Sequence, residues 1–330
     1  MTKLSIYQKD FETIFDNIVQ AKQTIYTQAR NIVIDLYWSV GRHISERVEN
    51  GVWGTGIVDD LAKYISQKDP AIKGFSNKNL WRMKQFFEAY KDDVILSPLV
   101  RELPWTHNTI IFSRCKTKEE KTFYLNLAIK ERYSKRELER QIDSSLFERT
   151  SITNTKIPDV LKKYSNIQNT FKDHYVLEFV GIPIEHSEND LQTAIVDNMK
   201  NFILEIGKDF IFIDKEFKVQ VGNSDFFIDL LFYNRRLSAL VAFEIKIGKF
   251  KPEYLGQLNF YLEALDRDIK KEHENPSIGV LLCSYKDDEV VEYAMSRTLS
   301  PTLVAQYTTL LPQKKLLQTK LHEIVTMLER

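Results

Sequence analysis

Cysteine is scarce in this chain, and neither sign of charge is in excess. The 330 residues include only two cysteines, Cys115 and Cys283, which lie far apart and lack the close Cys/His spacing of a zinc site. We therefore expect both thiols to be reduced and structural. The 46 basic and 46 acidic side chains give a formal net charge of zero. This balance argues against a protein that coats nucleic acid through bulk electrostatics.

Long apolar runs are also lacking. The first residues carry charges instead of the apolar run of a secretory signal, and no later run reaches the ~20 residues of a membrane helix. These absences predict a cytoplasmic protein of bacterial type, with no membrane partner. The chain is nevertheless 43% hydrophobic and 12% aromatic. It is long enough to bury a sizeable core, and we expect two domains.

The first half of the chain has the periodicity of helices. Apolar residues recur at helical spacing from Phe11 to Val19 and again, after a break, from Ile32 to Ile44. We predict that most of these side chains belong to a core. Further helical patterns cover 57–66, 77–90, 118–131 and 134–147.

Two of these helices, 57–66 and 77–90, flank a short turn. Such a pair is typical of a helix-turn-helix or winged-helix-like domain, although most helix pairs only pack. The second helix would present Asn77, Lys78 and Arg82, whose side chains are of the types that reach phosphates and base edges. These three residues are therefore candidate nucleic-acid contacts.

The second half changes character. A helical pattern at 188–206 precedes strand patterns and two more helices. The expected strands are 210–214, 215–221, 226–233, 240–247, 278–284 and 302–307, with helices at 252–265 and 287–296. We predict a two-domain α/β protein with an all-helical domain over 1–150 and a polar linker over 151–170. The domain at 171–330 would have an α-β-β-β-α-β core around a mixed sheet.

Three ionisable residues interrupt the two most apolar strand patterns. Asp229 lies in one strand, and Glu244 and Lys246 lie two residues apart, hence on one face, of the next. A turn centred on 234–237 would put Asp229 opposite Ala242 and diagonal to Glu244. Buried charges need partners or a metal ion.

Oxygen ligands of this kind suit a hard cation. Asp229, Glu244 and the carbonyl of Ile245 could bind Mg2+, with a phosphate completing the coordination. Lys246 would then orient or deprotonate an attacking water, its pKa lowered by the cation. The same residues could instead form a structural ion network across a hairpin. Spacing alone leaves both interpretations open.

The surrounding motifs resemble a known family. An Asp in one strand followed by Glu-x-Lys in the next resembles the PD-(D/E)xK nuclease signature of the restriction-endonuclease-like superfamily. The segments 225–233, 243–254 and 256–262 are similar to the YhcG-type family of bacterial PD-(D/E)xK nuclease-domain proteins. Leu36-Tyr37-Trp38, Gly74-Phe75-Ser76 and Leu103-Pro104-Trp105 resemble the helical N-terminal domain of that family. The Pro-Asp pair is absent, because Ile228 precedes Asp229.

This resemblance implies a nuclease dependent on Mg2+ or Mn2+, with Asp229, Glu244 and Lys246 at the three signature positions. It also implies that an acidic residue of the first core helix faces the metal. Of the polar residues near that helix start, Glu188, Asp190 and Gln192, we choose Glu188. Gln257, on the helix after the lysine strand, is expected to assist the phosphate or a water, whereas Tyr261 is expected to pack.

The basic residues around the hairpin indicate the partner. Arg235, Arg236, Lys249 and Lys251 could hold a phosphate backbone, although a pair of arginines in a turn is often only solvated. We expect nucleic acid, with DNA preferred, as substrate. The alternative is a non-catalytic module that binds nucleic acid or a protein partner and retains the nuclease fold. A monomer and a homodimer that makes paired cuts are both compatible with the sequence.

Overall fold

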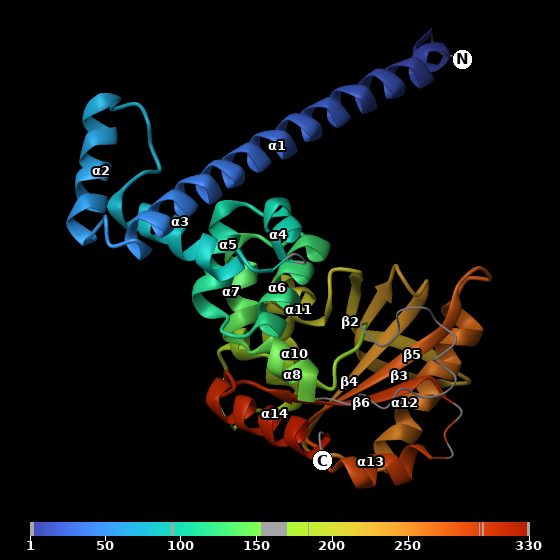
Figure 1. The fold of residues 1–330 in the computed structure, drawn as a ribbon. Coiled ribbons are helices and arrows are strands. Elements are labelled where there is room, and N and C mark those ends of the chain that lie inside the picture. Colours follow the sequence, from blue (N-terminus) through green and yellow to red (C-terminus); the bar gives the residue numbers. More distant parts are fainter. Residues whose placement is uncertain are drawn as a thin grey trace. The chain divides into compact units, whose positions relative to one another are not determined.

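The computed structural model describes residues 3–93, 96–152, 170–183, 185–296, 298 and 300–328. The chain divides into two compact units, Met1–Ile142 and Asp143–Arg330 (Figure 1). None of the described helices is long and apolar enough to cross a membrane. Most of the expected linker, 153–169, lies outside the described residues.

Within the described residues of unit 1 the regular elements are all helices, and there is no β-hairpin of the kind that forms the wing of a winged helix. Its elements are α1 (Lys3–Glu49), α2 (Thr55–Lys68), α3 (Asn77–Tyr90), α4 (Leu96–Leu99), the 3-10 helix η1 (Val100–Glu102), α5 (Trp105–Arg114), α6 (Lys118–Glu131) and α7 (Lys135–Asp143).

Helix α1 is a single helix of 47 residues, about 70 Å long at 1.5 Å per residue. The expected break between Val19 and Ile32 does not occur, because that stretch contains neither glycine nor proline. The prediction of core for the first part of α1 is also wrong. Phe15 and Ile18 are 65% and 60% exposed, and the fully buried positions of the helix begin at Ile34. The spacing of the apolar residues thus predicted the helix correctly, but it did not predict what their side chains pack against.

The later half of α1 packs closely on α3. A Cβ added at Gly41 would come within 2.1 Å of the carbonyl oxygen of Met83, so only glycine allows this approach. Ile44 of α1 and Val58 of α2 join Leu80 and Met83 of α3 in a small core. Ser76 occupies the N-cap position of α3. This core fixes α2 and α3 as the helix pair that the sequence predicts.

The described residues of unit 2 form one mixed sheet of six strands in the order β1-β6-β5-β4-β3-β2. β2, β3 and β4 pair antiparallel, and β4, β5, β6 and β1 pair parallel. The strands are β1 (His174–Val176), β2 (Phe210–Val221), β3 (Ser224–Asn234), β4 (Ala239–Lys249), β5 (Asn275–Tyr285) and β6 (Thr302–Thr308). The predicted α-β-β-β-α-β order is confirmed, and β2 unites two strands that were expected separately.

Helices cover both faces of this sheet. One apolar core lies between the sheet and α10–α11, and a second lies between the sheet and α12–α13. Gly279 of β5 lies under α12, where a Cβ would meet Leu258 at 2.8 Å. The helical elements are α8 (Leu146–Ile152), η3 (Glu178–Val180), α10 (Glu188–Asp197), α11 (Met199–Ile206), α12 (Glu253–Ala264), the π-helix η4 (Leu265–Ile269), α13 (Asp288–Met295) and α14 (Lys314–Leu328).

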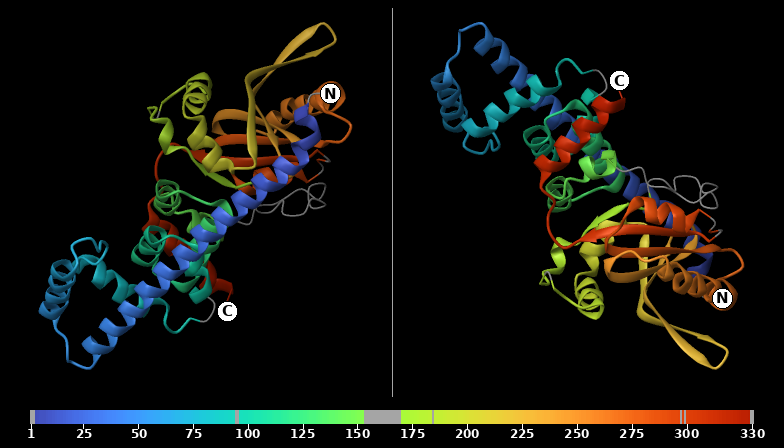
Figure 2. Two further views of the ribbon diagram at one scale, coloured as in Figure 1. Left: turned by 90° about the horizontal axis from the view of Figure 1, so that it is seen from above. Right: turned by 90° about the horizontal axis from the view of Figure 1, so that it is seen from below.

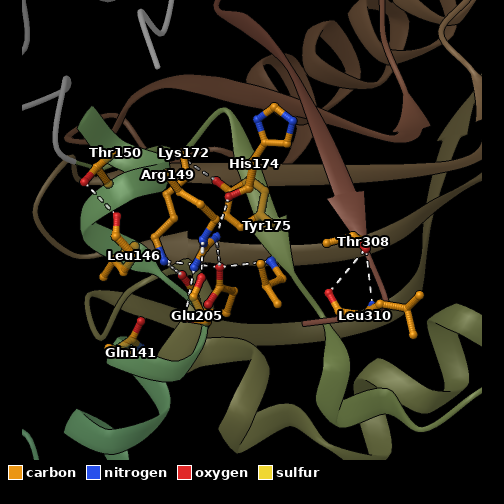
Figure 3. A network of polar contacts seen from close by, with 12 residues as sticks. Gln141, Leu146, Arg149, Thr150, Lys172, His174, Tyr175, Glu205, Thr308 and Leu310 are labelled. Atoms are coloured by element: carbon orange, nitrogen blue, oxygen red, sulfur yellow. Dashed lines mark hydrogen bonds and ion pairs between the residues drawn. The ribbon is translucent and has the colours of Figure 1, made fainter. Parts of the chain in front are cut away.

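A buried polar network joins α8 to the sheet domain (Figure 3). The Arg149 guanidinium donates to the carboxylate of Glu205 at 2.9 Å and to the His174 carbonyl at 2.9 Å. The backbone N–H of Val176 donates to the same Glu205 carboxylate at 3.1 Å, and Lys172 lies 3.4 Å from it. Glu205 is fully buried. Helix α8, which the sequence analysis assigned to the first domain, therefore packs in unit 2.

Candidate active site

The site lies where β3 separates from β4. Their pairing runs from Asn234 opposite Ala239 to Leu230 opposite Phe243, and β3 then continues with β2 as a two-stranded ribbon (Figure 2). Asp229 is the next residue of β3. Its side-chain Oδ2 accepts a hydrogen bond from the backbone N–H of Ile245 at 2.7 Å. The carboxylate thus bonds to β4 at the point where the ladder ends.

This register differs by two residues from the expected one. Asp229 does not lie opposite Ala242, because Ala242 pairs with Leu231. The cause is Asn234, which stays in the strand while its side-chain oxygen accepts hydrogen bonds from the N–H groups of Arg236 and Leu237. An asparagine that binds the turn in this way ends the strand later than composition suggests. The shift moves Asp229 closer to Glu244 along the strands.

Glu244 is buried beside Asp229. Its exposed fraction is 1%, its Oε1 lies 3.0 Å from the ammonium of Lys246, and its Oε2 has no hydrogen-bond partner in the described structure. Burial raises the pKa of Asp229 to about 6. Burial, followed by the charge of Asp229, raises the pKa of Glu244 to about 7. Two carboxylates held this close oppose each other's ionisation.

Lys246 lies between two carboxylates. It is 3.0 Å from Glu244 and 3.4 Å from Glu188, and its ammonium lies 5.7 Å from the centre of the Tyr254 ring. Burial lowers the pKa of Lys246, but the charge and hydrogen bond of Glu244, with the charges of Glu188 and Asp229, outweigh it and leave the pKa raised. The carboxylates around Lys246 thus raise its pKa, whereas the sequence predicted a pKa lowered by a bound cation.

Helix α10 contributes two side chains one turn apart. Glu188 accepts hydrogen bonds from the backbone N–H of Ile247 at 3.3 Å and from Lys246 at 3.4 Å. Asp190 instead completes the capping box with Ser187, so its carboxylate caps the N-terminus of α10. Gln192 is 6% exposed and lies close enough to Asp229 to lower the pKa of that carboxyl. It is one of the three polar residues expected near the helix start, and its i+4 spacing from Glu188 puts both on one face of α10.

Helix α12 adds a polar pair from the other side of the sheet. Gln257 donates to the Tyr261 hydroxyl at 2.8 Å. Tyr261 is 5% exposed, and burial raises its pKa, with smaller contributions from Glu244 and Asp229. The structure therefore brings together Asp229, Glu244, Lys246 and Glu188. Gln192 lies beside Asp229, and the Tyr261 hydroxyl is near enough for Glu244 and Asp229 to influence its pKa.

The basic residues predicted to bind nucleic acid are dispersed. Arg235 and Arg236 lie in the β3–β4 turn, five or more residues along the strands from the carboxylates, and both pair with Asp209. Lys249 and Lys251 follow the site directly; Lys249 lies 3.9 Å from Asp287 and is 57% exposed. In unit 1, Lys78 and Arg82 are exposed on α3, whereas Asn77 is only partly exposed.

The residues present fit a divalent cation that keeps most of its waters. No group of three or more His, Cys, Asp and Glu residues within the described ranges is arranged to hold a metal ion alone. Mg2+, however, commonly binds through one or two carboxylates, with waters and phosphate oxygens completing the octahedron. Asp229 and the unpartnered oxygen of Glu244 supply this set, and the Ile245 carbonyl is the predicted third donor.

The chain matches two family models, one in each half. The family model of the YhcG PDDEXK nuclease domain matches residues 168–322, and that of the DUF1016 N-terminal domain matches residues 13–149. A curated relative, the "Putative nuclease YhcG" of Escherichia coli (strain K12), is 27% identical over 98% of this chain and 96% of its own length.

Solved structures show weaker similarity. The crystal structure of a repair endonuclease from Pyrococcus abyssi has 17% identity and a TM-score of 0.27 over 40% of this chain and 50% of its own. The structure of EndoMS in apo form has 17% identity and a TM-score of 0.26 over 40% and 49%. The chain thus spans about half the length of these two solved chains. The two family models, matched in order over most of the sequence, place this chain in the YhcG family of PDDEXK nuclease-domain proteins.

Proposed function

We propose that unit 2 is a metal-dependent nuclease that hydrolyses phosphodiester bonds of DNA. One observation carries the proposal. Asp229 and Glu244 are held together in a buried site where each raises the cost of ionising the other, and one oxygen of Glu244 has no hydrogen-bond partner in the described structure. A fold tolerates such an arrangement when a cation compensates for it. Mg2+ or Mn2+ would bind both carboxylates in their ionised form.

Each side chain then has a defined task. Asp229, Glu244 and the Ile245 carbonyl would hold the ion, which supplies charge stabilisation at the phosphate and a water of lowered pKa. Lys246, protonated because its pKa is raised, would donate hydrogen bonds to a phosphate oxygen. Glu188 holds that ammonium in position, so we assign it a positioning role in preference to a metal ligand. Gln257 would contact the phosphate or a water.

Binding of the substrate is proposed for both units. Lys249, the last residue of β4, and Lys251, just beyond it, follow the site and would contact the strand being cut. Lys78 and Arg82 lie one helical turn apart on the exposed side of α3 and would contact phosphates of a duplex. Arg235 and Arg236 are engaged with Asp209 and are the weakest members of this set. We also propose a homodimer, and the surface that would form it lies on α1.

A cleavage assay tests the proposal. Plasmid, linear, single-stranded and branched DNA, with structured RNA, would be incubated with Mg2+, Mn2+ or chelator. The wild type would be compared with Lys246→Ala and with Lys200→Ala, which removes an exposed lysine of α11. We expect metal-dependent cleavage of DNA that is lost in Lys246→Ala and retained in Lys200→Ala. Salt-sensitive binding without cleavage under any metal would favour the non-catalytic module.

A further inference from the structure

The first part of α1 carries an exposed apolar stripe. Among its described side chains, Phe11, Ile18, Ile25 and Ile32 recur at every seventh residue and are 54%, 60%, 65% and 68% exposed. A seven-residue apolar repeat is the pattern by which helices pack side by side in coiled coils. The stripe is widened by Ile14, Phe15, Tyr26, Val33 and Leu36, all at least 40% exposed. Apolar patches this large on a soluble surface mark interaction sites.

Among the described residues of unit 1, none outside α1 buries this stripe. Within its own unit α1 packs on α3 and η1, and the buried positions of α1 run from Ile34 to Ser45. Isolated helices in water are marginal, and most helical stability comes from packing of an apolar face. The i, i+4 row through Ile32 and Leu36 continues to Val40 and Ile44, which belong to the core shared with α3. A second helix laid along the first part of α1 would therefore extend an existing core.

The order of charges between residues 10 and 30 indicates what that second helix is. The acidic residues of this range, Asp10, Glu12 and Asp16, come first, and the basic residues, Lys22 and Arg30, follow. The next acidic residue, Asp35, is already paired with Arg101 at 2.7 Å. An antiparallel copy of the same helix would bring the acidic part of each chain beside the basic part of the other. A parallel copy would bring like charges together.

The surface is large enough for a stable dimer. At the exposed fractions given above, the nine apolar side chains offer roughly 800 Å2 per chain, which is about what each partner contributes to a standard-size interface. The apolar composition suits an interface that persists in solution. We propose that the first part of α1 is a homodimer interface, in which the stripes of two copies pack antiparallel about a two-fold axis.

The oligomeric state tests the interface. Light scattering across a concentration series would compare the wild type with Ile18→Asp/Ile25→Asp and with Gln20→Asp/Thr27→Asp, which adds the same charge to exposed positions off the stripe. We expect twice the 38.8 kDa chain mass for the wild type and the control, and the chain mass for the stripe variant. Circular dichroism would show whether the stripe variant stays folded. A wild type that is monomeric at tens of micromolar overturns the proposal, including the case where unit 2 covers the stripe within one chain.

Spin labels test the direction of packing. Positions 20 and 27 lie on one face of α1, off the stripe, so only their separation along the axis should differ. If the heptad positions Phe11 to Ile32 pair over their full length, cysteines at position 20 lie about 5 Å apart along the axis and cysteines at position 27 about 17 Å apart, at 1.5 Å per residue. A parallel pair would give similar distances at both positions. We expect the shorter distance for Gln20→Cys and the longer one for Thr27→Cys. Equal distances at both positions would overturn the antiparallel arrangement, and cysteines 115 and 283 are buried and should not take the label.

Discussion

The carboxylate of Asp229 accepts a hydrogen bond from the backbone N–H of Ile245 at 2.7 Å, across the point where β3 and β4 separate. Beyond this point β3 has no backbone carbonyl paired with β4, and the Asp229 side chain accepts the hydrogen bond in its place. Asp229 therefore has two separable properties, a hydrogen-bond acceptor for β4 and a negative charge for a cation. Asparagine retains the first property and alanine retains neither.

This separation predicts different behaviour for two substitutions. Asp229→Asn should retain the hydrogen bond to Ile245 and remain fully folded, whereas Asp229→Ala should have an unfolding free energy about 1 kcal/mol below that of Asp229→Asn. Both variants should lose Mg2+ binding at least tenfold in titration calorimetry, because both lack the charge. Calorimetry and urea denaturation of the same samples would check this. Unchanged Mg2+ affinity in Asp229→Asn would show that the cation site lies elsewhere.

The pKa values predict a pH dependence of stability. The folded-state pKa values of Asp229 and Glu244, about 6 and about 7, lie above the ordinary values of 3.8 and 4.5. Between about pH 4 and 7 the folded protein holds protons that the unfolded chain has lost, so stability falls as pH rises through this window. Asp229→Asn removes one charge and should be more stable than the wild type at pH 8 by roughly 1–2 kcal/mol, discounting for partial exposure.

The control for this prediction is the metal. In chelator, the difference in unfolding free energy between Asp229→Asn and wild type should be small at pH 4 and grow toward pH 8. Saturating Mg2+ at pH 8 should stabilise only the wild type and reduce the difference. Parallel pH curves for the two proteins in chelator would contradict the raised pKa values.

Sequence predicted which residues of this site lie together better than the strand register that brings them together. The two-residue spacing of Glu244 and Lys246 placed them on one face, and their ion pair at 3.0 Å agrees. The register of Asp229 could not be predicted, because it depends on the Asn234 side chain binding the turn. A residue such as Asn234 can belong either to a strand or to a turn, and the sequence alone does not decide between them. Each residue by which the turn shifts changes which residues face each other on the two strands.

Other differences have the same origin in contacts that pattern does not encode. The three residues of β1 form a strand only because β6 lies beside them, and so short a segment carries no period. The exposed Phe15 and Ile18 had the period of a core helix, but a period shows which residues share a face and not what covers it. Gln192 acquires its contact with Asp229 from the docking of α10 on the sheet.

The exposed side of α3 gives a prediction for DNA binding. Lys78→Ala/Arg82→Ala should weaken binding of duplex DNA and reduce the slope of log affinity against log salt by about two, if each side chain neutralises one phosphate. The control is Lys116→Ala/Lys118→Ala, which removes two charges at the start of α6. Fluorescence anisotropy over a salt series would measure both. An unchanged slope in the α3 variant, with its fold intact, would remove α3 from the interface.

The buried Glu205 gives a prediction for stability and for the domain boundary. Glu205→Gln would leave Arg149 and Lys172 without their carboxylate, and breaking a buried ion pair on one side costs about 3–5 kcal/mol. For a unit of this size the melting temperature should fall by roughly 10 °C. Glu263→Gln, in an exposed pair with Arg267, should change it by less than about 2 °C.

The same network predicts where the nuclease unit can be cut from the chain. A chain that starts at residue 171 lacks Arg149 and should behave like Glu205→Gln or worse, because Glu205 is then buried without its main partner. A chain that starts at residue 143 retains α8 and should keep the melting temperature of unit 2 in the full protein. Scanning calorimetry of both fragments would decide. Equal stability of the two would mean that α8 contributes nothing to unit 2, and the domain would then begin after the linker, as sequence composition alone suggests.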